Sequence, residues 1–442
     1  MKHRIIIAAL AVTFALSSAY GNDAILDALV KKGVLTQQEA NQVREQADRE
    51  MAQTVEMYNK VKTSKWVDSL TFFGDTRLRY EWRAGSGNNT GSAVVNNADR
   101  DRFRFRLRFG LKGELNENFS YGVRLESGTG NRSSNATMGE NPAFGKGNNF
   151  AVQIGQVWGQ YKASDWLTLV GGKMENPFIT SSMVWDGDIN PEGAAEKFTF
   201  TTEKVDFFLT LGQFMYSDFL ENSFDSAGVV KNDSWLFGFQ AGAKARLTDK
   251  ITLTIAPTLY LYANAYEYTN ARFNPTVAAP SQNGGAINQL TVVEVPVELS
   301  FMLGKIPAKV FCDFAMNLNG SARAQAAGYP QNSQENFAYQ GGITLGSNKK
   351  KGDWQVKAFW QHAELFSLDP NLVDSDLFDS RLNMEGFAVS ALYMFTDYLY
   401  PSITYAHASA IKGNLPTSYS AADITGNVRN YDLLQVDLNW KF

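Results

Sequence analysis

The fold is decided by Leu433-Leu434-Gln435-Val436-Asp437-Leu438-Asn439-Trp440-Lys441-Phe442. From Leu434 to Phe442 every second residue is apolar, and the residues between them are polar. Because successive side chains of a β-strand point to opposite faces, this stretch predicts a strand with one apolar and one hydrated face. A soluble β-sandwich can contain one such strand, so the fold class depends on whether the pattern repeats.

The same period of two recurs from Leu70 onward. In residues 102–112, Phe and Leu alternate with Arg and Lys. Runs of this kind also cover residues 72–82, 119–126, 235–246, 293–301, 337–343, 354–360 and 387–393. The mean hydropathy of −0.26 is too low for a bundle of membrane-spanning helices. It is the average expected of strands that alternate lipid-facing and water-facing residues.

Connections between these runs alternate in length. Short turns such as Asn116–Asn118 and Thr248–Lys250 alternate with long polar loops, predicted to be external, such as Arg83–Arg100, Asn264–Gln289 and Phe366–Leu382. This asymmetry is typical of outer-membrane barrels. The sequence therefore predicts an all-β transmembrane antiparallel β-barrel of about 16 strands, a width that leaves an aqueous channel. Pro296 cannot donate a ladder hydrogen bond, which predicts a bulge in its strand.

The amino-terminal part has a different character. Lys2-His3-Arg4 precedes the apolar run Ile5–Leu16, which is too short to span a bilayer as a helix. We expect residues 1–21 to be a secretory signal peptide, residues 22–65 a short periplasmic helical segment, and residues 66–442 the barrel. A solvated helix and a coiled coil that joins protomers both remain open for residues 22–65.

The arginine ladder of residues 102–108 is the sharpest functional feature. Alternate residues of a strand lie roughly 6.6 Å apart on one face, and an Arg facing lipid costs about 2–4 kcal/mol near the midplane. These side chains must therefore face water, where they either attract anionic solutes or pair with acids to stiffen the wall. The predicted pore-lining residues are Arg77, Arg79, Arg102, Arg104, Arg106, Arg108, Arg124, Glu294, Glu298 and Asp313.

The three acids of that set follow the ladder by about half the strand count. In a closed barrel Glu294, Glu298 and Asp313 would face the arginine wall from across the lumen. This arrangement predicts a transverse electric field that orients dipolar solutes. Because the acids offset much of the arginine charge, we expect only a mild anion preference.

Two tracts carry a family resemblance. One is Trp185-Asp186-Gly187-Asp188-Ile189-Asn190-Pro191-Glu192-Gly193 in the third long loop, Glu175–Ala195, and the other is Leu29-Val30-Lys31-Lys32-Gly33-Val34-Leu35-Thr36-Gln37-Gln38-Glu39-Ala40. With Trp440 and the terminal Phe442, which look like the assembly signal of outer-membrane barrels, they resemble the bacterial "putative porin" family. The resemblance implies a Gram-negative outer-membrane pore, trimeric like the general porins.

In general porins the third loop folds into the barrel and narrows it. The resemblance therefore implies a constriction loop in which Asp186, Asp188 and Glu192 oppose the arginine ladder. Asp186, Asp188 and Asn190 also echo the first ligands of a calcium loop, but Pro191 stands where that loop needs Gly. Turn chemistry explains the same residues, so we expect no metal and no cofactor.

The predicted function is a porin that lets small hydrophilic solutes, including anionic ones, diffuse across the outer membrane. The expected partners are outer-membrane lipid, the barrel assembly machinery and two further copies of the chain, and nucleic acid is not expected. An enzyme is not expected, because the chain has three His and no Gly-x-Ser-x-Gly elbow. A barrel hydrolase, or an adhesin that binds a partner through its long loops, remains the alternative.

Overall fold

The computed structural model describes residues 30–32, 69–87, 98–128, 133–139, 151–218, 233–263, 290–417, 423–424 and 426–442. The chain divides into two units, residues 1–70 and 71–442, and almost all of the barrel belongs to the second. The predicted signal peptide and nearly all of the predicted helical segment lie outside the described residues. No helix within the described ranges is long and apolar enough to cross a membrane.

Antiparallel strands account for nearly all of the regular structure in the described part of the chain. The strands are β1 (Ser69–Ser86), β2 (Ala98–Glu114), β3 (Phe119–Ser127), β4 (Ala136–Thr137), β5 (Val152–Ser164), β6 (Leu167–Lys173), β7 (Glu192–Thr201), β8 (Val205–Ser217), β9 (Ser234–Thr248), β10 (Ile251–Ile255), β11 (Thr258–Ala263), β12 (Thr291–Leu303), β13 (Ile306–Asn317), β14 (Phe337–Gly346), β15 (Trp354–Ala363), β16 (Met384–Tyr393), β17 (Leu399–Ala410) and β18 (Asn430–Lys441). The described loops add the helix α3 (Gly320–Ala326) and the 3-10 turn η4 (Pro330–Asn332).

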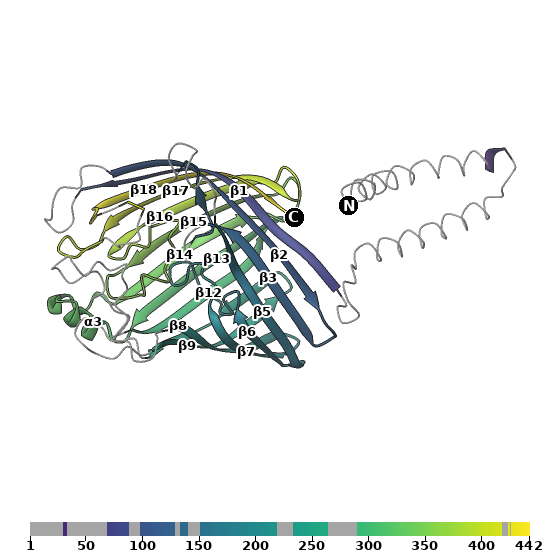
Figure 1. Cartoon of the computed structure of the whole chain (residues 1–442), viewed down its shortest axis with the longest axis horizontal. Coiled ribbons are helices and arrows are strands. Elements are labelled where there is room, and N and C mark those ends of the chain that lie inside the picture. The colour runs from purple at the N-terminus through teal and green to yellow at the C-terminus, as the bar shows by residue number, and fades with distance from the viewer. Residues whose placement is uncertain are drawn as a thin grey trace. The chain divides into compact units, whose positions relative to one another are not determined.

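These strands form one closed barrel. Neighbours in sequence pair in antiparallel fashion, and β1 pairs with β18 in a register that sets Thr76 opposite Trp440. Because β4 is a two-residue pairing within a loop and β10 and β11 are halves of one strand, the barrel has 16 strands. The predicted antiparallel barrel of about 16 strands is confirmed. In Figure 1, α3 lies at the end of the barrel opposite the carboxy terminus.

The seam between the first and last strands depends on Gly74. Its amide donates to the carbonyl of Phe442 over 3.0 Å, and the amide of Phe442 donates back to the carbonyl of Gly74 over 3.1 Å. A Cβ at residue 74 would lie 2.2 Å from the carbonyl oxygen of Arg108 and 2.7 Å from the ring of Phe442. Glycine is therefore required where the closing strand meets the first.

Alternation along the strands sorts side chains between the two faces. On β2, Phe103 is 62% exposed on the outer face, whereas Arg104 is 6% exposed on the inner face. The face of β2 that carries the arginines is the inner one, because Arg108 on that face contacts Asp188 of a loop that enters the barrel. A shift of the strand register by one residue would place every one of these arginines in lipid. The burial of their side chains therefore fixes the register.

The predicted bulge at Pro296 is wrong. The pairing of β12 with β13 runs from Val292 to Leu303 without a register shift. The ladder is instead interrupted on the neighbouring strand at Ala256-Pro257, between β10 and β11. The carbonyl of Pro296 accepts the amide of Ala256 over 3.1 Å, so the missing N–H of Pro296 faces this strand. Pro257 lacks its N–H on the other side of the strand, where its carbonyl accepts the amide of Ala241 over 3.1 Å. The two missing donors interrupt local pairing without an extra residue.

Two loops turn into the barrel, and we name them inner loop 1 (residues 174–191, between β6 and β7) and inner loop 2 (residues 364–383, between β15 and β16). Both carry buried apolar side chains that form one cluster with inward-facing residues of the wall. The main members are Met174, Phe178, Met183, Val184, Trp185, Leu365, Phe366, Leu368, Leu372, Val373 and Leu382 from the loops, and Phe214, Leu236, Tyr260 and Val292 from the strands. A substantial apolar core therefore lies inside the barrel.

Candidate functional site

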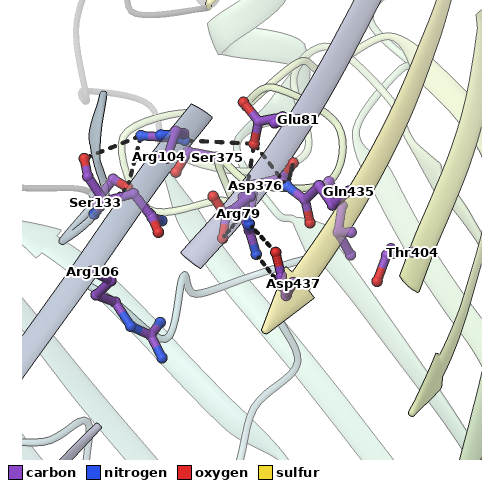
Figure 2. A network of polar contacts seen from close by, with 12 residues as sticks. Arg79, Glu81, Arg104, Arg106, Ser133, Ser375, Asp376, Thr404, Gln435 and Asp437 are labelled. Atoms are coloured by element: carbon purple, nitrogen blue, oxygen red, sulfur yellow. Dashed lines mark hydrogen bonds and ion pairs between the residues drawn. The ribbon is translucent and has the colours of Figure 1, made fainter. Parts of the chain in front are cut away.

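The arginines of β1 and β2 gather around one buried carboxylate. Glu81 is 0% exposed. Its carboxylate lies 2.9 Å from Arg83, 3.5 Å from Arg104 and 3.6 Å from Arg79, and it also contacts Arg102. Figure 2 shows Glu81 joined to Arg104 and to strand β18 through Gln435. One acid thus draws four guanidinium groups of the wall together.

Arg79 lies at the centre of a second group of contacts. It makes two hydrogen bonds to the carboxylate of Asp437, of 2.7 and 2.9 Å. On its other side it donates to Asp376 of inner loop 2 over 3.3 Å (Figure 2). The two-pronged geometry of a guanidinium suits such paired contacts. Arg79 therefore links the closing strand β18 to a loop in the lumen.

The remaining predicted arginines are also paired with acids. Arg77 lies 3.9 Å from Asp376, Arg102 donates to Asp423 over 2.9 Å, Arg106 to Asp75 over 2.6 Å, Arg108 to Asp188 over 2.5 Å, and Arg124 to Glu126 over 3.1 Å. The ladder is therefore close to electrically balanced by acids from β1, β3 and three loops. The sequence analysis allowed two roles for these arginines, attraction of anionic solutes and pairing with acids that stiffens the wall. The contacts seen here are of the second kind.

Inner loop 2 is fastened to this wall. Arg83 donates to the carboxylate of Asp379 over 2.9 Å and to the carbonyls of Ser375 and Asp376 over 3.2 Å each. Asp379 and Ser380 adopt left-handed backbone angles, with φ of 58° and 56°. Such angles are costly for residues other than glycine and persist only where surrounding contacts hold them. Arg83 of the wall supplies one of these contacts, and the amides of Asp423 and Ile424 also donate to the carboxylate of Asp379, over 2.8 and 3.2 Å.

Inner loop 1 crosses from the arginine wall to the opposite wall. At one end Asp188 accepts a hydrogen bond from Arg108 over 2.5 Å. At the other end the amide of Ile179 donates to Gln240 over 2.9 Å, and the hydroxyl of Thr180 donates to Glu294 over 2.6 Å. Asp186 does not reach the arginines. Its carboxylate instead accepts the amide and hydroxyl of Ser375, over 3.1 Å each.

The two inner loops are joined to each other. The amide of Asp186 donates to the carbonyl of Leu372 over 2.6 Å, and the amide of Asp374 donates to the carbonyl of Ser182 over 3.1 Å. Trp185 of inner loop 1 and Leu372 of inner loop 2 belong to the same buried apolar cluster. The loops therefore act as one partition inside the barrel.

The acids predicted for the opposite wall divide into two groups. Glu294 and Asp313 are buried beneath the tip of inner loop 1, where Ser181 donates its hydroxyl to Asp313 over 2.5 Å. Glu298 is partly exposed and pairs with Lys309 over 3.0 Å. The loop covers Glu294 completely, whereas Glu298 and one side of Asp313 border a cavity beneath the loop tip.

Glu192 is not part of the inner loop. It is the first residue of β7 and lies opposite Lys173 of β6, to which it is bound over 2.5 Å. The strand starts earlier than the sequence indicated because residues 192–201 pair with both β6 and β8. Trp440 and Phe442 lie at the barrel seam, where the ring of Phe442 is 6.5 Å from that of Phe109.

Burial raises the pKa of two loop carboxyls. The pKa of Asp374 rises to about 6 through burial and the neighbouring charge of Asp376. The pKa of Asp186 also rises well above its usual value, through burial and the charge of Asp374. Asp376 is buried too, but Arg79 and Arg77 hold its pKa well below the usual range. The junction of the two loops is therefore the titratable part of the partition.

A hydrolase would need a serine activated by a histidine and an acid. On the outer face His407 lies 2.9 Å from Asp432, and the hydroxyl of Ser409 lies 3.5 Å from the other ring nitrogen. That hydroxyl instead donates to Asn430 over the shorter distance of 2.9 Å. The arrangement therefore gives no specific support to an enzyme.

Within the described ranges, no three His, Cys, Asp or Glu side chains are grouped to hold a metal ion.

Sequence reasoning missed inner loop 2, which it treated as an external polar loop. The available signal was an apolar run, Leu365-Phe366-Ser367-Leu368, followed by Phe378 and Leu382 inside a stretch otherwise rich in Asp and Ser. So many large apolar residues are unusual in a loop that is exposed to solvent. The counter-acids Glu81, Asp376, Asp379, Asp423 and Asp437 were missed as well. The alternation along β1 could have indicated Glu81, which shares a face with Arg79 and Arg83, but no local pattern connects the other four to the arginines.

The family described as "putative porin" matches residues 55–292, more than half of the chain. The chain belongs to the "putative porin" family. Together, this family and the closed barrel support an outer-membrane channel rather than an enzyme. A search among curated proteins gave no significant match.

The chain is also similar to solved structures of porins. A Rhodopseudomonas blastica porin triple mutant is 12% identical, and the match covers 84% of this chain and 100% of that one, with a TM-score of 0.40. The Salmonella typhi OmpF complex with daunomycin is 11% identical, with 85% and 98% covered and a TM-score of 0.45. Similarities at this level carry no information about the function of this porin.

Proposed function

We propose that this porin forms a water-filled channel for small hydrophilic solutes, narrowed by inner loops 1 and 2 and mildly selective for anions. The observation that carries the proposal is a 16-stranded barrel whose inner wall is polar and ion-paired, in a chain of the "putative porin" family. An inner face lined with charged side chains supports a lumen that water and ions enter.

A mild preference follows from how the charges are distributed. Each arginine of the ladder has an acid nearby, so the field of the wall is small at a distance. Among the described residues, Arg104 has only Glu81 as an ion-pair partner and shares it with three other arginines, so this part of the ladder is less fully balanced than the one-to-one pair of Arg106 with Asp75. We infer that the transverse field is local to this part of the channel.

The test is single-channel conductance, with reversal potentials in a salt gradient across a planar bilayer. We expect the double variant Arg104→Ser, Arg106→Ser to shift the reversal potential toward cations and to enlarge the conductance, because it removes two charges and two long side chains. Low salt will amplify the shift, since the Debye length is about 30 Å at 0.01 M and about 3 Å at 1 M. Unchanged values would make the ladder a purely structural element.

We also expect the channel to respond to pH through Asp374. A carboxyl with a raised pKa in the folded protein stabilises the fold fully below the unfolded value of 3.8, and this stabilisation is lost as pH rises through about 6. Inner loop 2 is therefore seated more firmly at pH 5 than at pH 7.5. Conductance will be lower at pH 5, and Asp374→Asn will flatten this step. Asp165→Asn, at an exposed turn, is the matched control and will leave the step in place.

We propose that Phe442 and Trp440 serve as an assembly signal and that three chains associate. Support for the signal is that Phe442 completes the seam with Gly74, and the trimer rests on the resemblance to general porins. We expect Phe442→Ser to lower the amount of barrel in the outer membrane while leaving the conductance of assembled channels unchanged. Wild-type levels and equal heat resistance would contradict this role, and cross-linking of the purified protein reports the number of chains.

A further inference from the structure

A cavity of about 400 Å³ lies between the tip of inner loop 1 and the turn-bearing ends of β10 and β12–β15. Small-molecule sites commonly have roughly 300–1,000 Å³. Thr180 and Ser181 of the loop cover it on one side. A solute that passes the inner loops would therefore meet this space next.

One cation in this cavity makes no ion pair with a described residue, although the charge of Asp374 acts on it from a distance. Lys357 of β15 forms no ion pair with another described residue, whereas Lys309 is paired with Glu298 over 3.0 Å. The ammonium group of Lys357 lies 5.1 Å from the ring centres of both Phe311 and Phe359. The faces of two aromatic rings hold a cation in position without neutralising it. Lys357 is therefore a fixed positive charge that remains available to an anion.

Two acids also line the cavity: Glu298 pairs with Lys309, and Asp313 accepts the hydroxyl of Ser181. The other polar groups around Lys357 are neutral. The cavity is lined by the amide of Gln355 and the hydroxyls of Thr254 and Thr344. Among the described residues, none of these three side chains makes a hydrogen bond to another residue. Amides and hydroxyls both donate and accept, which suits the hydroxyl groups of a solute. The apolar lining beside them includes Phe311, Pro296 and Val297.

We propose that this cavity is a binding site for small hydroxylated carboxylates of the sugar-acid class, with Lys357 binding the carboxylate. The charge-assisted contact supplies most of the discrimination against neutral sugars, and the threonines and Gln355 bind the hydroxyl groups. The site rests on the proposed channel function, to which it adds a preferred solute.

The test uses D-glucuronate as the probe, with D-glucose and benzoate for comparison. Block of the potassium chloride current is measured in planar bilayers, and binding to the protein in detergent is measured by calorimetry. We expect glucuronate to bind and block, and Lys357→Gln to raise the concentration for half-block about tenfold, as for the loss of one charge-assisted contact. Lys112→Gln is the matched control, because Lys112 is also held over a phenylalanine ring, 5.8 Å from Phe73, but lies on β2 outside the cavity. It will change the half-block concentration by less than about twofold.

Each outcome decides the proposal. Equal losses in the two variants would mean a general charge effect and would overturn the assignment to Lys357. A wild-type channel that conducts potassium chloride but neither binds nor is blocked by glucuronate would overturn the site and leave the channel function standing. Preference for benzoate over glucuronate would overturn the sugar-acid class. Binding in detergent that depends on Lys357, without any conductance, would support the site while refuting the channel.

Discussion

Replacing residues 369–380 of inner loop 2 with a Gly-Ser segment of equal length will raise the single-channel conductance severalfold. The replacement removes Asp376 and Asp379, which bind Arg79 and Arg83, and it removes Leu372 from the buried cluster. A flexible segment without these anchors gains conformational entropy by leaving the lumen. Because Arg79 and Arg83 then lose counter-charges, the anion preference will rise with the conductance.

A control separates this effect from general loosening of the barrel. The same kind of replacement in residues 347–352, an exposed turn between β14 and β15, is expected to leave conductance and reversal potential as they were. The single variant Asp376→Asn, which breaks only the contacts to Arg79 and Arg77, will give an intermediate increase. If the conductance of the loop replacement stays at the wild-type value, inner loop 2 does not narrow the channel.

Glu81→Gln will cause the largest loss of stability from a single substitution. Removing one member of a buried ion pair costs about 3–5 kcal/mol, because the partner charge remains buried and uncompensated. Here four arginines contact the same carboxylate, and Glu81 itself is completely buried. The loss is measured as a lower temperature for the shift from the compact to the unfolded band in detergent gels.

The matched control is Glu192→Gln. Its side chain is 62% exposed, and its pair with Lys173 lies near the surface, so we expect a cost of about 0–1 kcal/mol. Equal unfolding temperatures for the two variants would show that the Glu81 cluster does not hold the arginine wall. A lower temperature for Glu81→Gln alone would show that the acids in the lumen are structural partners of the arginines.

Local chemistry was enough to predict the barrel and the facing of its side chains. Period-two alternation is a property of neighbouring residues, and the cost of an arginine in lipid leaves one orientation for Arg104 and Arg106. The third long loop is a different case, because its place inside the barrel was expected only from the resemblance of its tract to a known family. These inferences need no knowledge of what lies across the lumen.

The closed structure alone decided which acids the arginines meet and which loops fill the lumen. Arg79 and Asp376 are 297 residues apart, and Arg83 and Asp379 are 296 apart, so no local pattern connects them. Inner loop 2 shows no regular alternation of apolar and polar residues. Its left-handed residues Asp379 and Ser380 depend on surrounding contacts, among them those of Asp379 with Arg83 and with the amides of Asp423 and Ile424. The sequence by itself determined the barrel and the inward arginines, because both follow from the pleat of a strand and the cost of charge in lipid. Tertiary structure decided the partition and its charge balance, because those depend on which distant segments a closed barrel brings within hydrogen-bond distance.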